Sequence, residues 1–229
     1  MKFLLIIAFI TIQLNAQTFS ISLGKNSVAH EISKKILIKA YARIGIQPKF
    51  ISTGFLKSLE LANSGKTDGD VSRVKQVSKK YPNLIAVPVE INFIEAVAFS
   101  KKHTIKINNW KDLAPYKIVI VKGIKFIEYN TEGFDRVIVA NYKEAFDLLH
   151  SMKADIIIVP KLVGILNQFK NTQEHIKAIS PSLKKLSLYH FVHKKNAYLI
   201  PKLVPVLKAM QKSGELQYIR SAYLRQLTK

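Results

Sequence analysis

The sequence predicts an α/β protein, and three observations carry that prediction. Short apolar runs alternate along the chain with segments whose apolar residues recur every three or four positions. Two of the runs, KIVIV at 117–121 and DIIIV at 155–159, are almost continuously apolar, as strands buried on both faces are. The length of 229 residues and the 48% hydrophobic content suit one large domain or two small lobes.

The first sixteen residues, MKFLLIIAFITIQLNA, differ from the rest of the chain. Lys2 gives a short positive start, residues 3–12 are apolar, and Leu14-Asn15-Ala16 forms a cleavage site. Ten to twelve apolar residues are too few to span a bilayer. We therefore expect a signal peptide at 1–16, a periplasmic mature chain that begins near Gln17, and no membrane insertion after cleavage.

Composition narrows the possible chemistry. The chain has no cysteine, which excludes disulfides, thiol catalysis and cysteine-ligated metal. Its net charge of +21 favours anionic partners. The lysines come as scattered doublets rather than as one arginine-rich, aromatic-interleaved stripe, so we expect no nucleic-acid partner. A generally basic surface is the alternative explanation of the charge.

The first half of the chain predicts alternating elements. Ser27 is placed to cap a helix whose apolar face ends at Gly45, and Phe55 begins the apolar face of a second helix. We expect strands at 19–23, 48–52, 84–89 and 94–100, with helices between the first three of them.

The second half repeats the alternation. Asn141 with Glu144 has the pattern of a helix start. We expect strands at 117–121, 135–139, 155–159, 176–179 and 186–192, with helices between the first four of them. Two further helices, at about 201–213 and 216–227, close the chain, and Pro205 is expected near the start of the first because a proline deeper inside would kink it.

The stretch LANSGKTDGDVSR at 61–73 is the most informative local pattern. It predicts a helix that stops at Gly65, a turn and a short strand that leaves Arg73 facing open space. Arg73 is one of only five arginines, and a guanidinium offers a rigid fork of donors that suits a carboxylate or phosphate. The structural alternative is that Arg73 pairs with Asp68 or Asp70 and holds the turn.

Several segments together resemble the bacterial extracellular solute-binding proteins of family 3, which are type II periplasmic binding proteins. The matching pieces are LANSGKTDGDVSR, YPNLIAVPV at 81–89, NNWKDLAPYKIVIVKG at 108–123, YKEAFDLLHSMKADIIIV at 142–159 and LYHFVHKKNAYLIPKLVPVLKAMQKSGELQYI at 188–219. The resemblance implies two α/β lobes joined by two crossing strands, with ligand held between them. Residues 17–98 and 190–229 would form the first lobe and 99–189 the second.

The resemblance also implies a site at the carboxyl ends of strands, where open α/β sheets bind ligands. Arg73 lies where the family places its carboxylate-binding arginine, beside Gly69 and Asp70. The turn Lys122-Gly123, with Lys125, occupies the position that the family offers to the ligand carboxylate, and Phe55 is a candidate to line the cleft. Val159 and Pro160 stand where the family has an acidic residue for the ligand amine.

Catalytic patterns are absent from the sequence. The six histidines form no HExxH or other compact ligand pattern, and the chain has no GxSxG or P-loop. We expect no enzyme activity, no metal and no cofactor. The sequence favours a monomeric binding protein that passes a small polar, anionic or amino-acid-like solute to an ABC permease or membrane sensor. The alternative is a basic periplasmic protein that contacts anionic polymer or a partner protein.

Overall fold

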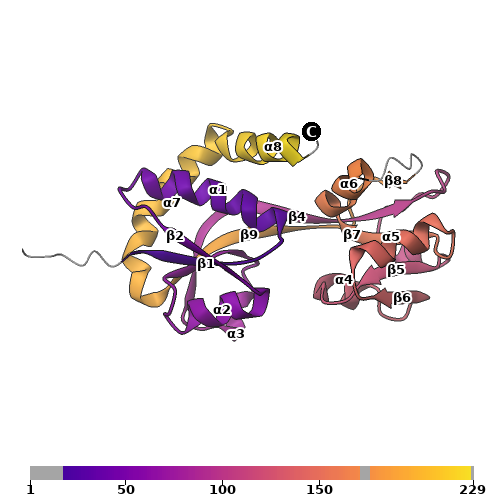
Figure 1. Cartoon of the computed structure of the whole chain (residues 1–229), viewed down its shortest axis with the longest axis horizontal. Helices are drawn as coiled ribbons and strands as arrows, with labels where there is room; N and C mark the ends of the chain where they lie inside the picture. Colours follow the sequence, from indigo (N-terminus) through magenta and orange to yellow (C-terminus); the bar gives the residue numbers. More distant parts are fainter. Residues whose placement is uncertain (1–17, 171–175, 228–229) are drawn as a thin grey trace, which may run out of the picture.

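The computed structural model describes residues 18–170 and 176–227, and it has two lobes joined by long strands (Figure 1). The predicted signal peptide and the predicted start at Gln17 lie outside these residues. Within the described ranges, none of the helices combines the length and the apolar character that crossing a bilayer requires.

The first lobe begins as the predicted alternation of strands and helices. Its elements are β1 (Ser20–Gly24), α1 (Val28–Ala42), β2 (Lys49–Thr53), α2 (Phe55–Asn63), β3 (Gly69–Arg73) and α3 (Val77–Lys80). The side chain of Ser27 caps α1 by accepting a hydrogen bond from the His30 amide, as the sequence predicts. β1 pairs in parallel with both β2 and β3, so the carboxyl ends of the three strands share one edge.

The second lobe repeats the alternation. After a 3₁₀ turn at Trp110–Leu113 come β5 (Ile118–Val121), α4 (Lys125–Asn130), β6 (Arg136–Val139), α5 (Tyr142–His150), β7 (Ile156–Pro160), α6 (Lys161–Lys170) and β8 (Lys177–Ala178). Asn141 caps α5 through the Glu144 amide at 3.0 Å, which confirms the predicted helix start. β5 pairs in parallel with β6 and β7.

The two lobes share one sheet of order β2-β1-β3-β9-β4-β7-β5-β6. Its middle strands, β4 (Leu84–Ser100) and β9 (Lys184–His193), are antiparallel and run from one lobe into the other (Figure 1). The prediction of two strands at 84–89 and 94–100 is wrong, because they are one strand. Its register shifts between Ala86 and Glu90, where Pro88 has no N–H to give to the ladder. The predicted lobe boundaries at 98/99 and 189/190 fall within these two strands, and they stay predictions.

The chain returns to the first lobe through a 3₁₀ segment at Lys194–Leu199, followed by α7 (Ile200–Lys212) and α8 (Glu215–Leu227). Pro201 lies in the first turn of α7, where a missing N–H costs nothing. The prediction that Pro205 lies near the helix start is wrong, because α7 begins at Ile200 and Pro205 lies inside it, beyond the first turn. The helix also begins directly on the preceding 3₁₀ segment, so its first turn lies earlier than the apolar pattern indicates.

Each lobe has its own core. In the second lobe, alternate residues of β5 and β7 pack on opposite faces of the sheet, which explains their continuous apolar runs. Val119 and Ile157 face one cluster, while Ile118 and Ile156 face the other. In the first lobe, α1 packs over β3 and β4 and α7 packs over β4, around residues such as Leu37 and Leu203, both fully buried.

Gly69 lies where β3 pairs with β9, close to the backbone of Phe191. A Cβ at this position would lie 2.3 Å from the Phe191 carbonyl oxygen, which the β-sheet holds in place. We expect Gly69→Ala to lower the free energy of unfolding by about 2–3 kcal/mol, the range that overpacking produces. Gly54→Ala is the matched control, because its Cβ would meet nothing within 4 Å. Equal stability of the two variants in urea titrations would contradict this account.

Candidate functional site

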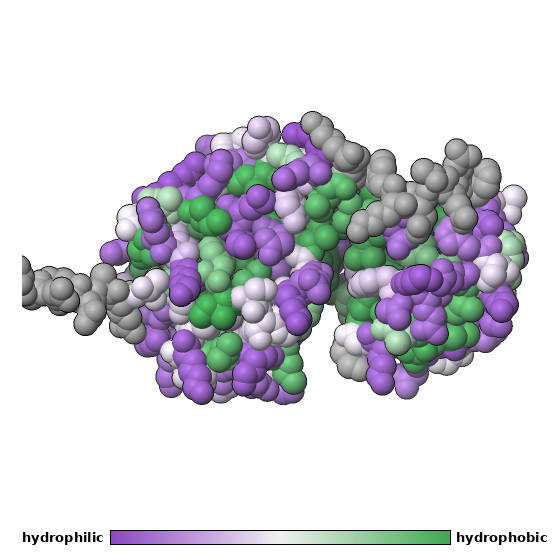
Figure 2. Space-filling view, viewed as in Figure 1, coloured by the Kyte–Doolittle hydropathy of each residue, from purple (hydrophilic) through white to green (hydrophobic). Residues whose placement is uncertain are grey.

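A hollow separates the two lobes on the face seen in Figure 2. β1 runs from the outer end of the first lobe toward this hollow, and α4, which follows β5, lies on its other side (Figure 1). Carboxyl ends of strands from both lobes therefore approach it. We call this hollow the interlobe cleft.

The ion pair between Arg73 and Asp70 is the centre of the first lobe's contribution. The Nε of Arg73 donates to Asp70 Oδ1 at 2.8 Å, and Nη2 donates to Asp70 Oδ2 at 3.0 Å. Nη2 also donates to the Phe55 carbonyl at 3.2 Å and to Ser58 Oγ at 2.5 Å. The prediction that Arg73 faces open space is therefore wrong: its side chain is 11% exposed, and the ion-pair alternative is the observed arrangement.

This pairing leaves Arg73 with one nitrogen to offer. The carboxylate of Asp70 takes the Nε–Nη2 edge of the guanidinium, which is the edge that grips an external carboxylate with two parallel bonds. Among the described residues, Nη1 has no hydrogen-bond acceptor. Arg73 as placed here can therefore offer a ligand only the two N–H groups of Nη1, and no fork of two neighbouring nitrogens.

Phe55 forms an aromatic surface beside the pair. Its ring is 49% exposed, and the guanidinium carbon of Arg73 lies 5.4 Å from the ring centroid, within cation–π range. On the other side the ring lies directly on Gly24, where a Cβ would come within 2.7 Å of it. Glycine at position 24 therefore leaves the space that the Phe55 ring occupies at the strand end, while Phe55 stays about half exposed.

His30 supports the same surface from below. Its ring centroid lies 5.0 Å from that of Phe55, and its Nδ1 accepts a hydrogen bond from the Gly24 amide at 2.9 Å. Burial, together with the nearby positive charge of Arg73, lowers the pKa of His30 to about 3. The ring is neutral at neutral pH. We refer to Gly24, His30, Phe55, Ser58, Asp70 and Arg73 as the Arg73 cluster.

Asp70 lies entirely beneath the surface. Its side chain is fully buried, and desolvation raises its pKa while Arg73 and the hydrogen bonds of Ser58 and Ser72 act in the opposite direction. With Arg73 charged and Asp70 ionised, the pair carries no net charge. The Arg73 cluster is thus a nearly neutral surface with one aromatic face.

The second lobe places Lys122 and Gly123 after β5. Gly123 adopts φ +95°, a conformation that favours glycine, and Lys122 is exposed. The Gly123 amide donates to Glu128 Oε1 at 2.5 Å, so a carboxylate of the chain itself occupies this N–H. The side chain of Lys125, also a predicted site residue, lies outside the described parts of the structure.

The carboxyl end of β7 carries no acidic group. Val159 is buried and Pro160 ends the strand, followed by Lys161, whose Nζ lies 3.7 Å from Glu95. Asp155 lies at the opposite end of β7, where it accepts from the Lys117 amide and pairs with Lys102. The charge that would hold a ligand amine in the resembled family therefore has no counterpart at this strand end.

The structure brings four predicted residues together and keeps the others apart. Arg73 contacts both Phe55 and Asp70, and Gly69 precedes Asp70 in β3. Lys122 and Gly123 belong to the second lobe. Sequence reasoning missed His30 and Ser58, and its only signal for Gly24 was the strand end. In the described parts of the chain, no group of three or more His, Asp or Glu side chains is placed to hold a metal ion.

Solved structures resemble the whole described architecture. The GluR0 ligand-binding core in complex with L-glutamate matches with a TM-score of 0.74 at 12% identity, over 92% of this chain and 99% of that chain. A histidine kinase sensor domain with similarity to periplasmic binding proteins gives 0.69 at 16% identity, over 91% and 96%. The chain has the type II periplasmic-binding-protein fold. The fold that the sequence resemblance implied is confirmed.

Other members of this fold extend the comparison. One is the second substrate-binding domain assigned to an amino-acid ABC transporter of Streptococcus pneumoniae. It matches with a TM-score of 0.68 at 17% identity, over 90% of this chain and 100% of that chain. A sequence relative, an uncharacterized protein of Shewanella oneidensis, is 24% identical over 202 residues, which cover 83% of this chain and 75% of the relative. No model of a known protein family matches the chain.

Proposed function

We propose that this protein is an exported, non-catalytic solute-binding protein that holds a small polar ligand in the interlobe cleft. The observation that carries the proposal is the half-exposed side chain of Phe55 at the carboxyl ends of β1 and β3. Its ring packs on Gly24 and lies beside the ion pair of Arg73 and Asp70, whose charges cancel. Ligands of open α/β sheets bind at such strand ends. The fold supports the proposal, because solved structures that share it include a ligand-binding core, a substrate-binding domain and a sensor domain.

The cluster favours a ligand with a flat or apolar part and a separate acceptor. Phe55 offers a face for stacking, and Arg73 offers the two N–H groups of one nitrogen, Nη1. The basic surface attracts anions to the cleft. We therefore propose a small anionic or amino-acid-like solute that is recognised by stacking and by single hydrogen bonds rather than by an arginine fork.

The two buried histidines near the cluster support a non-catalytic role. His30 Nδ1 is occupied by the Gly24 amide, and both nitrogens of His190 are occupied by Tyr41 and by the Asp70 carbonyl. Neither ring is placed to accept a proton from a substrate. We propose a periplasmic location and delivery to an ABC permease or a membrane sensor.

Thermal unfolding of the mature protein against amino acids, organic acids, sugars and phosphate esters tests the proposal. A ligand at a hundred times its dissociation constant adds about 2.7 kcal/mol of stability, which raises the unfolding midpoint by about 5–10 °C in a chain of this size. Phe55→Ala is expected to weaken binding about tenfold, because an aromatic contact contributes about 0.5–1.5 kcal/mol beyond its buried area.

Tyr218→Ala is the matched control, since Tyr218 is 64% exposed on α8, away from the cleft. The same loss of affinity in both variants would remove Phe55 from the site. A panel without any shift, combined with retention on anionic polymer that falls steeply with salt, would favour the basic interaction protein instead.

A further inference from the structure

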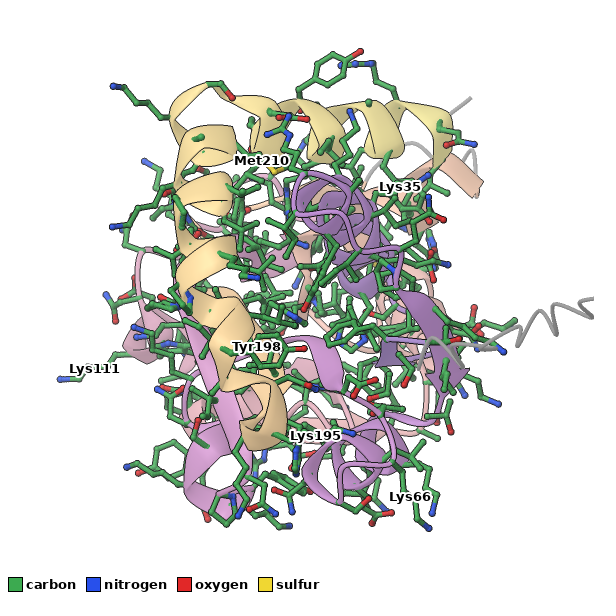
Figure 3. The ribbon with its side chains drawn as sticks, turned by 90° about the vertical axis from the view of Figure 1, so that its left-hand side faces the viewer. Lys35, Lys66, Lys111, Lys195, Tyr198 and Met210 are labelled. Atoms are coloured by element: carbon green, nitrogen blue, oxygen red, sulfur yellow. The ribbon has the colours of Figure 1, made fainter. Side chains whose placement is uncertain are left out.

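A cavity of about 150 Å³ lies outside the interlobe cleft, where the corner between α7 and α8 packs on the crossing strand β4. Figure 3 shows this corner, with Met210 pointing inward from α7 beneath α8. The cavity walls that matter here are Ile91, Phe93, Gln211, Leu216, Gln217 and Arg220. We call it the corner cavity.

Arg220 is the unusual member of this wall. The residue is only 6% exposed. Its Nη1 donates to the Asn92 side chain and, at 3.1 Å, to the Phe93 carbonyl, and the guanidinium stacks 3.9 Å from the Phe93 ring centroid. These contacts use one nitrogen and one face of the guanidinium.

The other edge of the guanidinium opens into the cavity. Among the described residues, Nε and Nη2 of Arg220 have no hydrogen-bond partner, and no carboxylate lies within ion-pair distance. Every fully buried side-chain nitrogen or oxygen in these residues does have a partner. Nε and Nη2 must therefore keep contact with open space, and the open space beside Arg220 is the corner cavity.

A buried guanidinium without an anion is costly, because its charge has left water without gaining a counter-charge. Arg73, which is also mostly buried, shows the usual solution, since Asp70 takes its fork. Burial lowers the pKa of Arg220 and the more distant Glu95 carboxylate opposes this, but an arginine stays charged. Glu90, also in the wall, is already engaged by Ser187 and lies 3.7 Å from Lys185.

We propose that the corner cavity binds a small monocarboxylate, whose two oxygens accept from Nε and Nη2 of Arg220. A planar fork of donors matches a carboxylate with two parallel hydrogen bonds. Ile91 and Leu216, both at least nine-tenths buried, line the same space and suit a short apolar tail. A cavity of this size holds about six non-hydrogen atoms, by comparison with a 150 Å³ cavity that binds benzene.

This site is independent of the interlobe cleft. It joins α8 to β4, one of the two strands that cross between the lobes. A bound carboxylate adds a contact between them and stabilises the folded protein through mass action.

The test uses butyrate. By their formulas, butyrate, the control compound butyramide and benzene all have six non-hydrogen atoms, which is about the size that the cavity admits. Thermal unfolding of the mature protein is measured with butyrate, with the neutral butyramide, and with chloride at equal ionic strength. We expect butyrate alone to raise the unfolding midpoint in a saturable way. Equal midpoints in the three solutions would overturn the proposal.

Two variants locate the binding. Gln217→Glu places a carboxylate on the cavity wall, in the first turn of α8 where an acidic residue is well tolerated. We expect it to weaken butyrate binding tenfold or more and to unfold at a higher temperature than Gln226→Glu, which makes the same charge change near the other end of the helix. Arg220→Lys keeps the charge without the fork and is expected to weaken binding about tenfold.

Three results would overturn the assignment. One is equal butyrate affinity in Gln217→Glu and Gln226→Glu. The second is unchanged affinity in a folded Arg220→Lys protein. The third is loss of butyrate binding in Phe55→Ala, since that would place the compound in the interlobe cleft. Because Phe55→Ala is expected to leave butyrate binding unchanged, failure of the cleft proposal and failure of this one are distinguishable.

Discussion

Arg73→Met is expected to lower the free energy of unfolding by about 3–5 kcal/mol, the cost of removing one partner from a buried ion pair. Asp70 is fully buried, and Arg73 supplies two of the hydrogen bonds that hold its carboxylate. Without the guanidinium, the carboxylate would stay in a dry environment with only Ser58 and Ser72 as partners. Chemical denaturation at pH 7 measures the effect.

The double variant Asp70→Asn/Arg73→Met distinguishes the interaction energy of the ion pair from the effects of the two single substitutions. Once both charges are removed, no uncompensated ion stays buried, so we expect the double variant to be more stable than Arg73→Met alone. The coupling energy from the mutant cycle should lie within about 0.5–3 kcal/mol, the range for residues in direct contact. Additive effects of the two substitutions would contradict this interpretation.

The Arg73→Met defect should also depend on pH. Burial raises the pKa of Asp70 above its ordinary value, and Arg73 opposes that rise. A group that binds its proton more tightly in the folded state stabilises the fold as pH falls. Without Arg73 the rise is larger, so the defect should shrink as the pH is lowered toward the folded pKa of Asp70.

Lys75→Met is the control for this experiment, because it removes an equal charge from an exposed neighbour whose Nζ lies 4.6 Å above the Tyr189 ring. Its effect should be below about 1 kcal/mol, as for surface substitutions in general. If Arg73→Met proved no more costly than Lys75→Met, the ion pair would be a weak surface contact.

Local pattern was enough to predict most elements of this fold. The strands of the second lobe could be predicted from KIVIV and DIIIV. Both faces of that sheet are buried, so each strand is a short, continuous apolar run that the sequence shows directly. Helix starts at Ser27 and Asn141 could be read because a cap is a contact within three residues.

Contacts between distant residues were beyond local pattern. β4 was split in the prediction because Pro88, Glu90 and Asn92 interrupt its apolar run. In the structure Asn92 is buried, and its partners are Ser33 and Arg220, far away in the sequence. Ser58 and His30 likewise join the Arg73 cluster only after β1, α2 and β3 have come together. The pairing of Asp70 with Arg73 was visible as an alternative because it is local.

Acid is expected to destabilise the protein well above the pH at which ordinary carboxylates are protonated. His190 is fully buried, and burial lowers its pKa to about 4, while His30 falls to about 3. The unfolded chain binds these two protons near pH 6.5 and the folded chain does not. Their contribution to stability is therefore complete above pH 6.5 and is lost as pH falls toward 4, by roughly 6 kcal/mol in total.

The hydrogen bonds of His190 explain why it resists protonation. Because Nδ1 faces the Asp70 carbonyl at 2.9 Å, it carries the proton and donates, and Nε2 accepts from the Tyr41 hydroxyl at 2.7 Å. A second proton on Nε2 would turn the Tyr41 hydroxyl away and leave a charge in the core. Burial also raises the pKa of Tyr41, so that hydroxyl stays neutral.

Urea titrations at pH steps between 7 and 4 measure this loss. His190→Gln keeps a donor and an acceptor but cannot be protonated. The stability of this variant should therefore fall less steeply with acid than that of the unmodified protein, and we expect the same of His30→Gln. His103→Gln is the control, because His103 is exposed. A slope that none of these substitutions changes would assign the acid sensitivity to the carboxylates.

The same titration bears on the cleft. His30 holds the Gly24 amide under the Phe55 ring, and His190 holds the Asp70 carbonyl under the Arg73 pair, so protonation of either ring disturbs the backbone on which the cluster is built. Because the folded chain protonates His190 only near pH 4 and His30 only near pH 3, the ligand affinity of the molecules that are still folded should fall in that range. If affinity stayed constant until unfolding, the two histidines would support the core and leave the cleft unaffected.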